Sequence, residues 1–314
     1  MRNFSTHVSA PGRIILFGEH AVNYGGIGLA VAVEHRVHCM AKVDSSFMVN
    51  GEELDPEKHR YTRGAVLQGW TDMDKPLSIQ LDSQISDGMG LGKTAASTVA
   101  CLGAISMMHD HLIFEELARN AFEVQHGLDS WANPLDVAAS THGRGVAVLP
   151  GKHDGDLWAF SGGEDNWSAF DIDVKELVLV LGYTGIPALE ERIISKVNRF
   201  YQQNSFARDI MSDLCHVASL GYEAVKKGDL ERTGKLMSKY HKLLLTLGAG
   251  HHELDKLVRA VSRYSYGAKL TGAGGGGCVV ALAHDPEGAA EAIDRAGGTG
   301  LVLKIAERGI QLED

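Results

Sequence analysis

The sequence predicts a mixed protein of strands and helices, organised in two domains or in one large domain. Strand-like and helical segments alternate in the first half, whereas helical spacing of apolar residues dominates the second half. The chain has 314 residues, a length that is common for two domains. Residues 151–167 are rich in Gly, Asp, His and Ser, so we place a linker there and expect domains over 1–165 and 166–314.

The N-terminal half carries two predicted strands and two predicted helices. Residues 8–17 contain an apolar run and residues 29–43 are rich in β-branched residues, and both patterns favour strands. Residues 94–109 are dense in Ala, Val, Leu and Met, which predicts a buried helix. In residues 114–125, acidic and apolar positions alternate at helical spacing, which predicts a second helix.

The C-terminal half is expected to be mainly helical. Residues 177–181 form an apolar run typical of a buried strand. Four segments then show apolar residues at i, i+3 and i+4, and we expect a helix over each of them: 189–203, 206–226, 229–246 and 252–264. The chain ends with a strand, a helix and a strand.

The composition excludes several classes of protein. With 30 Lys and Arg against 40 Asp and Glu the formal net charge is −10, which argues against nucleic acid as a partner, because such binding depends on basic patches. The four cysteines form no CxxC or Cys/His cluster and are expected to be reduced thiols. The N-terminus has no apolar signal core, and the longest apolar run is far shorter than a membrane span. We therefore expect a cytoplasmic protein that does not bind membranes.

Glycine is over-represented, with 37 residues in 314 where about 7% is usual. Residues 88–94 place three glycines before a predicted helix, an arrangement in which backbone N–H groups and the helix dipole attract an anion such as a nucleotide phosphate. The following Lys-Thr pair adds a positive charge and a hydroxyl that can reach Mg²⁺. A tight loop that only packs a helix on a sheet is the alternative. The segment is not a P-loop, because that motif needs Gly at the position of Asp87.

A second glycine-rich segment, residues 272–277, has five glycines in six positions. Glycine is unfavourable in regular elements because it loses the most backbone entropy on folding. The segment is therefore expected to be a loop whose backbone touches a ligand or another part of the chain.

Taken together, these segments resemble the three motifs of the GHMP kinases. Residues 10–22 are similar to the first motif, 85–96 to the second and 269–278 to the third, in the same order and over nearly the whole chain. Residues 18–25 and 268–272 are most similar to the mevalonate kinase branch. The resemblance implies an α+β fold with an N-terminal domain similar to ribosomal protein S5 domain 2, a C-terminal ferredoxin-like domain, and the site between them.

The resemblance implies ATP- and Mg²⁺-dependent phosphorylation of the primary hydroxyl of mevalonate. ATP and a small hydroxylated acid would be the ligands, Mg²⁺ the cofactor, and a homodimer is kept open as the assembly. Two departures keep other GHMP acceptors open, namely a sugar, phosphomevalonate or homoserine: Arg13 stands where mevalonate kinases usually carry lysine, and Leu189-Glu190 where a Ser-Thr pair is common. A non-catalytic ligand sensor is the alternative from another class.

The resemblance also assigns catalytic and metal-binding residues. Asp136 matches the family's catalytic aspartate, with Asp129 as a minor rival, and Arg13 would lie beside the acceptor hydroxyl. Thr94 falls where a serine hydroxyl binds Mg²⁺, and Glu123 falls near the second Mg²⁺ ligand. Asp136 would either deprotonate or orient the hydroxyl, and the cation of Arg13 would stabilise the developing alkoxide.

The remaining expected contacts are with the nucleotide and the acceptor. The nucleotide contacts belong to the two glycine-rich segments: Gly88, Met89, Gly90, Leu91, Gly92, Lys93, Thr94, Ala95, Gly274 and Gly275. Lys93 departs from the family's serine, and it either contacts a phosphate or points to solvent. The acceptor would be faced by Glu19, His20 and Thr184.

Each of these residues also has a purely structural interpretation when taken alone. Asp136 would be a helix N-cap, Glu123 a solvated helix position, Arg13 an ion-pair cation and His20 a half-buried histidine. Their order around two glycine-rich loops favours the functional interpretation.

Overall fold

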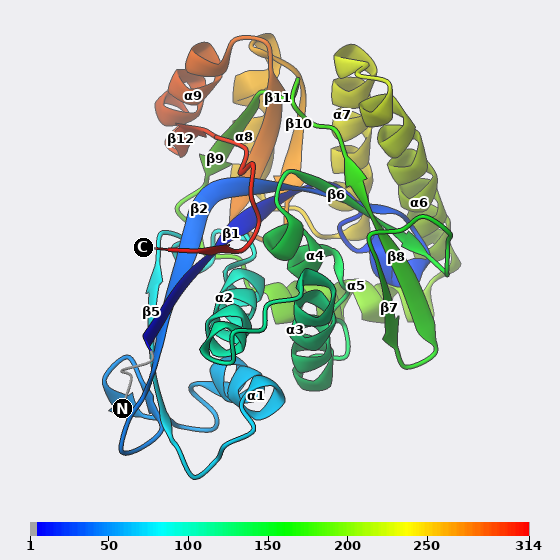
Figure 1. The fold of residues 1–314 in the computed structure, drawn as a ribbon. Helices are drawn as coiled ribbons and strands as arrows, with labels where there is room; N and C mark the ends of the chain where they lie inside the picture. The colour runs from blue at the N-terminus through cyan, green and yellow to red at the C-terminus, as the bar shows by residue number, and fades with distance from the viewer. Residues whose placement is uncertain (1–4, 314) are drawn as a thin grey trace.

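The computed structural model describes residues 5–313, which form two sheets with helices packed against them (Figure 1). The first sheet has nine strands: β1 (Ser5–Phe17), β2 (Gly28–Val43), β3 (Met48–Val49), β4 (Glu52–Glu53), β5 (Leu77–Ser83), β6 (Gly145–Pro150), β7 (Trp158–Gly162), β8 (Asp165–Ile172) and β13 (Gln311–Leu312). Their order is β4-β3-β5-β2-β6-β8-β7, and β1 pairs with both β2 and β13. The last strand of the chain thus returns to the sheet in which the chain begins.

Four helices pack beside this sheet: α1 (Arg60–Gly69), α2 (Lys93–Met108), α3 (Phe114–Leu128) and α4 (Leu135–His142). Figure 1 shows them together below the long strands β1 and β2, with α2 and α3 side by side. Helix α2 is buried at nearly every position from Ala95 to Ile105. Its small residues allow close approach to β1, β2 and the neighbouring helices, which confirms the predicted buried helix.

The second sheet has four antiparallel strands in the order β10-β11-β9-β12. They are β9 (Leu179–Tyr183), β10 (Ser265–Thr271), β11 (Cys278–Ala283) and β12 (Thr299–Val302). The helices of this part are α5 (Glu190–Gln203), α6 (Ser205–Lys226), α7 (Leu230–Leu247), α8 (His252–Ala260) and α9 (Pro286–Arg295). Helix α7 packs against β10 and against α6. The helix expected over 252–264 divides into α8 and a short 3-10 helix, η2 (Val261–Arg263).

None of the helices in residues 5–313 has the length and apolar character needed to cross a membrane.

The linker predicted over 151–167 is wrong, because much of that segment belongs to the β7–β8 hairpin of the first sheet. Trp158, Phe160 and Trp167 are buried there, and β8 also pairs with β6. The Gly, Asp and Ser residues that suggested a linker mostly serve the turns. A division after residue 165 would separate the two strands of this hairpin, since the chain enters the second sheet only at β9. The division into domains stays a prediction.

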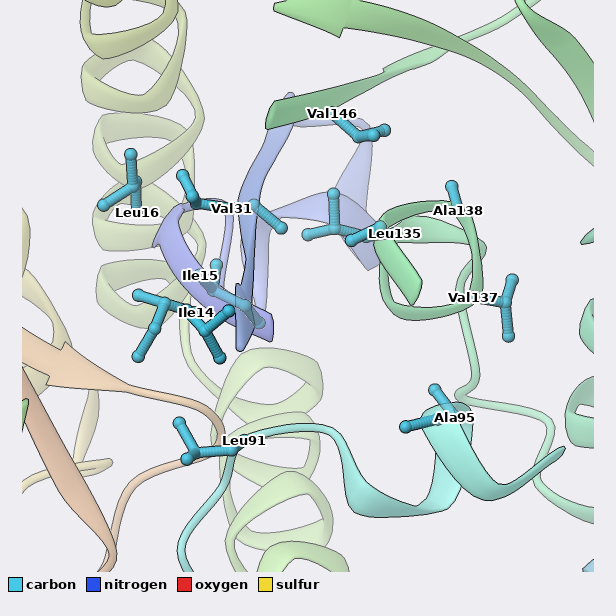
Figure 2. Packing of buried hydrophobic residues seen from close by; sticks show 14 of the residues in the cluster. Ile14, Ile15, Leu16, Val31, Leu91, Ala95, Leu135, Val137, Ala138 and Val146 are labelled. Carbon is cyan, nitrogen blue, oxygen red and sulfur yellow. The ribbon is translucent and has the colours of Figure 1, made fainter. Parts of the chain in front are cut away.

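The largest apolar cluster includes the segments that carry the candidate catalytic residues. Figure 2 shows labelled side chains from β1, β2, β6 and α4 gathered in one region, with Leu91 and Ala95 near the start of α2. Ile14 and Leu135, which adjoin Arg13 and Asp136 in the sequence, are both fully buried. A buried neighbour therefore anchors the backbone of each of the two charged residues in the core.

Candidate active site

A cavity of about 310 Å³ lies where β1, the start of α2, the segment before α4 and the start of α5 meet. Its wall also includes the short 3-10 helix η1 (Ala21–Tyr24) and the beginning of the second glycine-rich loop. The predicted residues Arg13, Glu19, His20, Thr94 and Asp136 all line it. Segments that are far apart in the sequence thus converge on one concave site.

Arg13 and Asp136 form a two-point ion pair in this cavity. Nε of Arg13 donates to Oδ1 of Asp136 at 2.6 Å, and a terminal guanidinium nitrogen donates to Oδ2. The other terminal nitrogen donates to the carbonyl oxygen of Gly90 at 2.6 Å. Burial alone would lower the pKa of Arg13, but the carboxylate of Asp136 raises it above its ordinary value. Arg13 therefore stays charged, and its contacts link β1, α4 and the first glycine-rich loop.

The close approach of this loop to β1 depends on Gly12. A Cβ there would lie 2.6 Å from Cδ1 of Ile85 and 2.7 Å from the carbonyl oxygen of Leu91. The space that glycine leaves lets N–H of Arg13 donate to that same carbonyl at 2.9 Å. Gly12 thus joins the first motif to the second.

The first glycine-rich loop leads into α2 as predicted. Gly88, Gly90 and Gly92 have φ of 74°, 74° and 72°, and Gly92 is the N-cap of α2. All predicted nucleotide contacts in this loop line the cavity except Met89, which packs against the core. Thr94 is exposed at the cavity. The Nζ atom of Lys93 donates to Asp87 at 2.8 Å, so its charge is already paired.

The second glycine-rich loop reaches the cavity at Gly272 and Ala273. Gly274 and Gly275 do not line the cavity and pack instead on the loop after α7 and on α5. A Cβ on Gly274 would lie 2.1 Å from the carbonyl oxygen of Ala249, and N–H of Gly275 donates to that oxygen at 2.9 Å. These two glycines allow contact between chain segments, which was the other outcome the sequence allowed.

Glu19 forms a sealed ion pair with Lys269, a residue that the sequence analysis did not assign. The Nζ atom of Lys269 donates to Oε1 of Glu19, to Leu270 O at 2.6 Å and to Ile15 O at 3.3 Å. Burial raises the pKa of Glu19 and lowers that of Lys269, and each partner's charge offsets the other's shift. Among the described residues Oε2 of Glu19 has no partner. The pair ties β10 of the second sheet to the loop after β1.

His20 lines the cavity, whereas Thr184 does not. Nε2 of His20 lies 3.0 Å from the carbonyl oxygen of Ala273, so this nitrogen carries the proton, and burial lowers the pKa of the ring. The hydroxyl of Thr184 donates to Gly277 O at 2.8 Å and accepts from N–H of Ile186 at 3.2 Å. It therefore holds the second glycine-rich loop rather than facing the acceptor.

Glu123 is not brought to the site. Its side chain is exposed on α3 and accepts a hydrogen bond of 2.8 Å from Nε2 of Gln68 on α1. The residue of α3 that lines the cavity is Gln125. The predicted second metal ligand is thus on the outer side of its helix, because positions two apart in a helix do not share a face.

Part of the cavity wall is formed by residues that sequence reasoning missed or gave a minor role. Asn23 donates through Nδ2 to Trp131 O at 2.8 Å, and Asp129 accepts from N–H of Trp131 at 3.0 Å. Glu190 lines the cavity at the start of α5, and its pKa is raised first by its poorly hydrated surroundings and then by Asp136 and Asp129. Neither Asp129 nor Glu190 forms a salt bridge within residues 5–313. Of the two residues at the departure 189–190, Glu190 therefore lines the cavity.

The cavity lining includes oxygen ligands of the kind that Mg²⁺ prefers. In the described part of the chain no three His, Cys, Asp or Glu side chains are grouped to hold a metal ion. The donors of the cavity lining include the hydroxyl of Thr94 and the carboxylate of Asp136. One hydroxyl and one carboxylate suit Mg²⁺, which proteins usually bind through one or two carboxylates, substrate phosphates and water.

Family models match three parts of the chain. The model described as the GHMP kinases N terminal domain matches residues 60–144, and that described as GHMP kinases C terminal matches residues 222–300. A model described as the galactokinase galactose-binding signature matches residues 3–43. These ranges include Arg13, Thr94 and Asp136.

Individual proteins match nearly the whole chain. The mevalonate kinase of Pyrococcus abyssi is 31% identical over 98% of this chain and 97% of its own length. The mevalonate kinase of Methanothermobacter thermautotrophicus is 33% identical over 87% of this chain and 88% of its own. The structure of L. major mevalonate kinase in complex with R-mevalonate has a TM-score of 0.69 at 25% identity, covering 92% of this chain and 90% of that chain. The similarity therefore spans both sheets and the cavity between them.

Proposed function

Since the chain belongs to the GHMP kinase family and has its α+β fold, we propose that it transfers a phosphoryl group from ATP to the primary hydroxyl of mevalonate, giving 5-phosphomevalonate and ADP. The observation that carries the proposal is the Arg13–Asp136 pair, which stands in one cavity with the glycine-rich start of α2. Relatives named mevalonate kinase over nearly their full length supply the acceptor.

The nucleotide's phosphates would be bound by the first glycine-rich loop. Backbone N–H groups at the start of α2 have no intrahelical partner, and the helix dipole favours negative charge there. Thr94 adds a hydroxyl at that position. Mg²⁺ bound with ATP would be held by Thr94 and Asp136 and would neutralise charge on the phosphates.

Asp136 would accept a hydrogen bond from the acceptor hydroxyl and take its proton. The hydroxyl oxygen then forms a bond to the γ-phosphorus, the bond from that phosphorus to the β–γ bridging oxygen breaks, and ADP leaves with the electron pair. Arg13 holds Asp136 at two points and places a permanent positive charge beside the developing alkoxide. Most of the catalysis is therefore positioning and charge neutralisation.

A neutral sugar is the second candidate acceptor. The galactose-binding signature over residues 3–43 favours it. So do Asp129 and Glu190, because two carboxylates at the acceptor end would repel an acid but can accept hydrogen bonds from a polyol.

An acceptor panel separates these possibilities. The wild-type protein with ATP and Mg²⁺ is offered mevalonate, phosphomevalonate, galactose and homoserine, and ADP formation is measured. Mevalonate is expected to give the highest kcat/KM. ADP with galactose but not with mevalonate would establish the sugar kinase, and binding of ATP and mevalonate without any ADP would indicate a ligand sensor.

We also propose a cytoplasmic location, which is supported by the four free cysteines, of which Cys39, Cys101 and Cys278 are buried. A homodimer stays a prediction, and sedimentation of the purified protein tests it.

A further inference from the structure

The inner face of α3 presents an amide to the cavity. Positions 123 and 125 differ by about 200° around a helix, so their side chains point in nearly opposite directions. Glu123 contacts Gln68 on the outer side, whereas Gln125 is 7% exposed and lines the cavity. The direction in which each side chain leaves the helix therefore decides that α3 contributes Gln125, and not Glu123, to the site.

The amide of Gln125 is incompletely satisfied. Its Nε2 atom is buried and has no hydrogen-bond partner among the described residues. A buried donor without a partner lowers the stability of the fold, because it has lost its hydrogen bonds to water. Such a group in a binding cavity is explained if a ligand supplies the missing acceptor.

The position of Gln125 indicates which ligand group that acceptor belongs to. Helices α2 and α3 are joined by the short connection 109–113 and pack side by side, so they run antiparallel (Figure 1). Gln125 lies in the last turn of α3 and is therefore beside the first turns of α2. That end of α2 carries Thr94 and the N–H groups proposed to bind the nucleotide's phosphates.

The charges in the cavity point to the same ligand group. The carboxylates of Asp129 and Glu190 also line the cavity, and a hydroxylated acceptor can donate hydrogen bonds to them. An N–H donor on α3 is best matched by an acceptor oxygen that carries negative charge, because hydrogen bonds to ionised groups are the stronger ones. Phosphate oxygens of a nucleotide have that charge.

We propose that Gln125 is a nucleotide-contacting residue whose Nε2 donates a hydrogen bond to a phosphate oxygen of ATP, in place of the carboxylate that α3 was expected to supply. The inference rests on the proposed function, since ATP is the ligand. Because α3 gives a neutral donor rather than a carboxylate, Asp136 would be the carboxylate that holds the metal that accompanies ATP in the proposed function.

The test compares Gln125→Met with the matched control Glu123→Gln, which changes the outer side of the same helix. Methionine keeps the shape of glutamine and removes the donor. Affinity for ADP and for a non-hydrolysable ATP analogue is measured by calorimetry with and without Mg²⁺, together with kcat, KM and the melting temperature. Gln125→Met is expected to lower kcat/KM for ATP and analogue affinity by about tenfold to a hundredfold. Its melting temperature should be unchanged or higher, because an unpaired buried donor has been removed.

Three results would overturn the inference. Analogue affinity within twofold of wild type in Gln125→Met would show that the amide does not contact the nucleotide. Weaker acceptor binding with unchanged analogue affinity would place the amide on the acceptor. A larger loss in Glu123→Gln than in Gln125→Met would return the role to Glu123.

A second variant keeps the test valid if Gln125→Met does not fold. Gln125→Glu keeps the size and places a negative charge toward the phosphates, so binding of ADP without Mg²⁺ should weaken at least tenfold and depend more steeply on Mg²⁺ concentration. Binding equal to wild type at every Mg²⁺ concentration contradicts the proposal. Because these are binding measurements, absence of turnover in the wild type would refute the proposed function while leaving the role of Gln125 open to this test.

Discussion

Two ion pairs stand at the centre of this molecule, and they differ in how far they are open to the cavity. In the Arg13–Asp136 pair the side chain of Asp136 is 28% exposed, whereas Glu19 and Lys269 are 1% and 0% exposed. The open pair can meet a substrate, exchange a proton and stabilise a developing charge. In the sealed pair Lys269 already donates to three protein oxygens, so its ammonium group has no proton left to offer a substrate. A similar charge pattern thus joins two sheets in one place and, in the proposed function, serves chemistry in the other.

The largest expected effect on activity comes from removing the negative charge of Asp136 in the open pair. Asp136→Asn should lower kcat by about 10²–10⁴-fold, because the side chain can no longer take the acceptor's proton. One hydrogen bond from Arg13 to the new amide oxygen can persist, so the fold should survive. Steady-state kinetics and thermal unfolding check both points. Near-normal turnover would remove the catalytic role from Asp136 and make Asp129 the next candidate.

Breaking the sealed pair should act first on stability. Lys269→Met leaves Glu19 buried without its counter-charge, which typically costs about 3–5 kcal/mol of unfolding free energy. The double variant Glu19→Gln/Lys269→Met should recover most of that loss, since no uncompensated charge is left. Urea unfolding of the two variants measures this. If the double variant is no more stable than Lys269→Met, the interaction between the two charges is not what the sealed region depends on.

The sealed region should also give stability a dependence on pH. His241 accepts from N–H of Leu270 at 3.2 Å, and burial, followed by the charge of Lys269, lowers its pKa to about 4. Since the unfolded ring has a pKa near 6.5, the unfolded state binds more protons between pH 6.5 and 4. Stability from this group is full above pH 6.5 and is lost as the pH falls toward 4, by up to about 3 kcal/mol.

The variant His241→Gln tests this dependence, because glutamine can accept the hydrogen bond but does not titrate. Unfolding free energy is measured from pH 4 to 7 in both proteins. The difference between them should change with pH in the window from 4 to 6.5. Parallel curves would show that His241 titrates normally in the folded protein.

The sequence predicted the long elements well and the short ones poorly. Helices α3, α5, α6 and α7 have a clear apolar period over several turns, and α2 is dense in apolar residues; the structure confirms all five within a few residues. Helix α4 has eight residues, which is too few for the period to show, and α1 is polar. The β7–β8 hairpin was missed because its turn residues dominate the local composition.

The candidate site was predictable where the resemblance to the family assigned a residue directly. The first glycine-rich loop, Arg13 and Asp136 converge as the order of the motifs implied. Lys269 could not be found in this way, because its partner Glu19 lies 250 residues away and only the folded chain brings them together. Glu123 was assigned from its approximate place in a motif, but two residues along a helix change the direction of a side chain completely.

The smallest expected effect concerns a third ion pair, which is open to solvent on both sides. Lys93 and Asp87 lie at the mouth of the cavity with side-chain exposures of 36% and 91%. Exposed pairs contribute about 0–1 kcal/mol, because water screens both charges. Lys93→Ala should therefore change the unfolding free energy by less than about 1 kcal/mol, and the KM for ATP by no more than about fivefold. A tenfold or larger rise in that KM, with Asp87→Ala unchanged, would mean that Lys93 leaves Asp87 for a phosphate when ATP binds. Exposure of a side chain would then be a poor guide to function at this edge of the site. The difference between the open and the sealed pair would depend instead on which group each charge contacts when the substrates are bound.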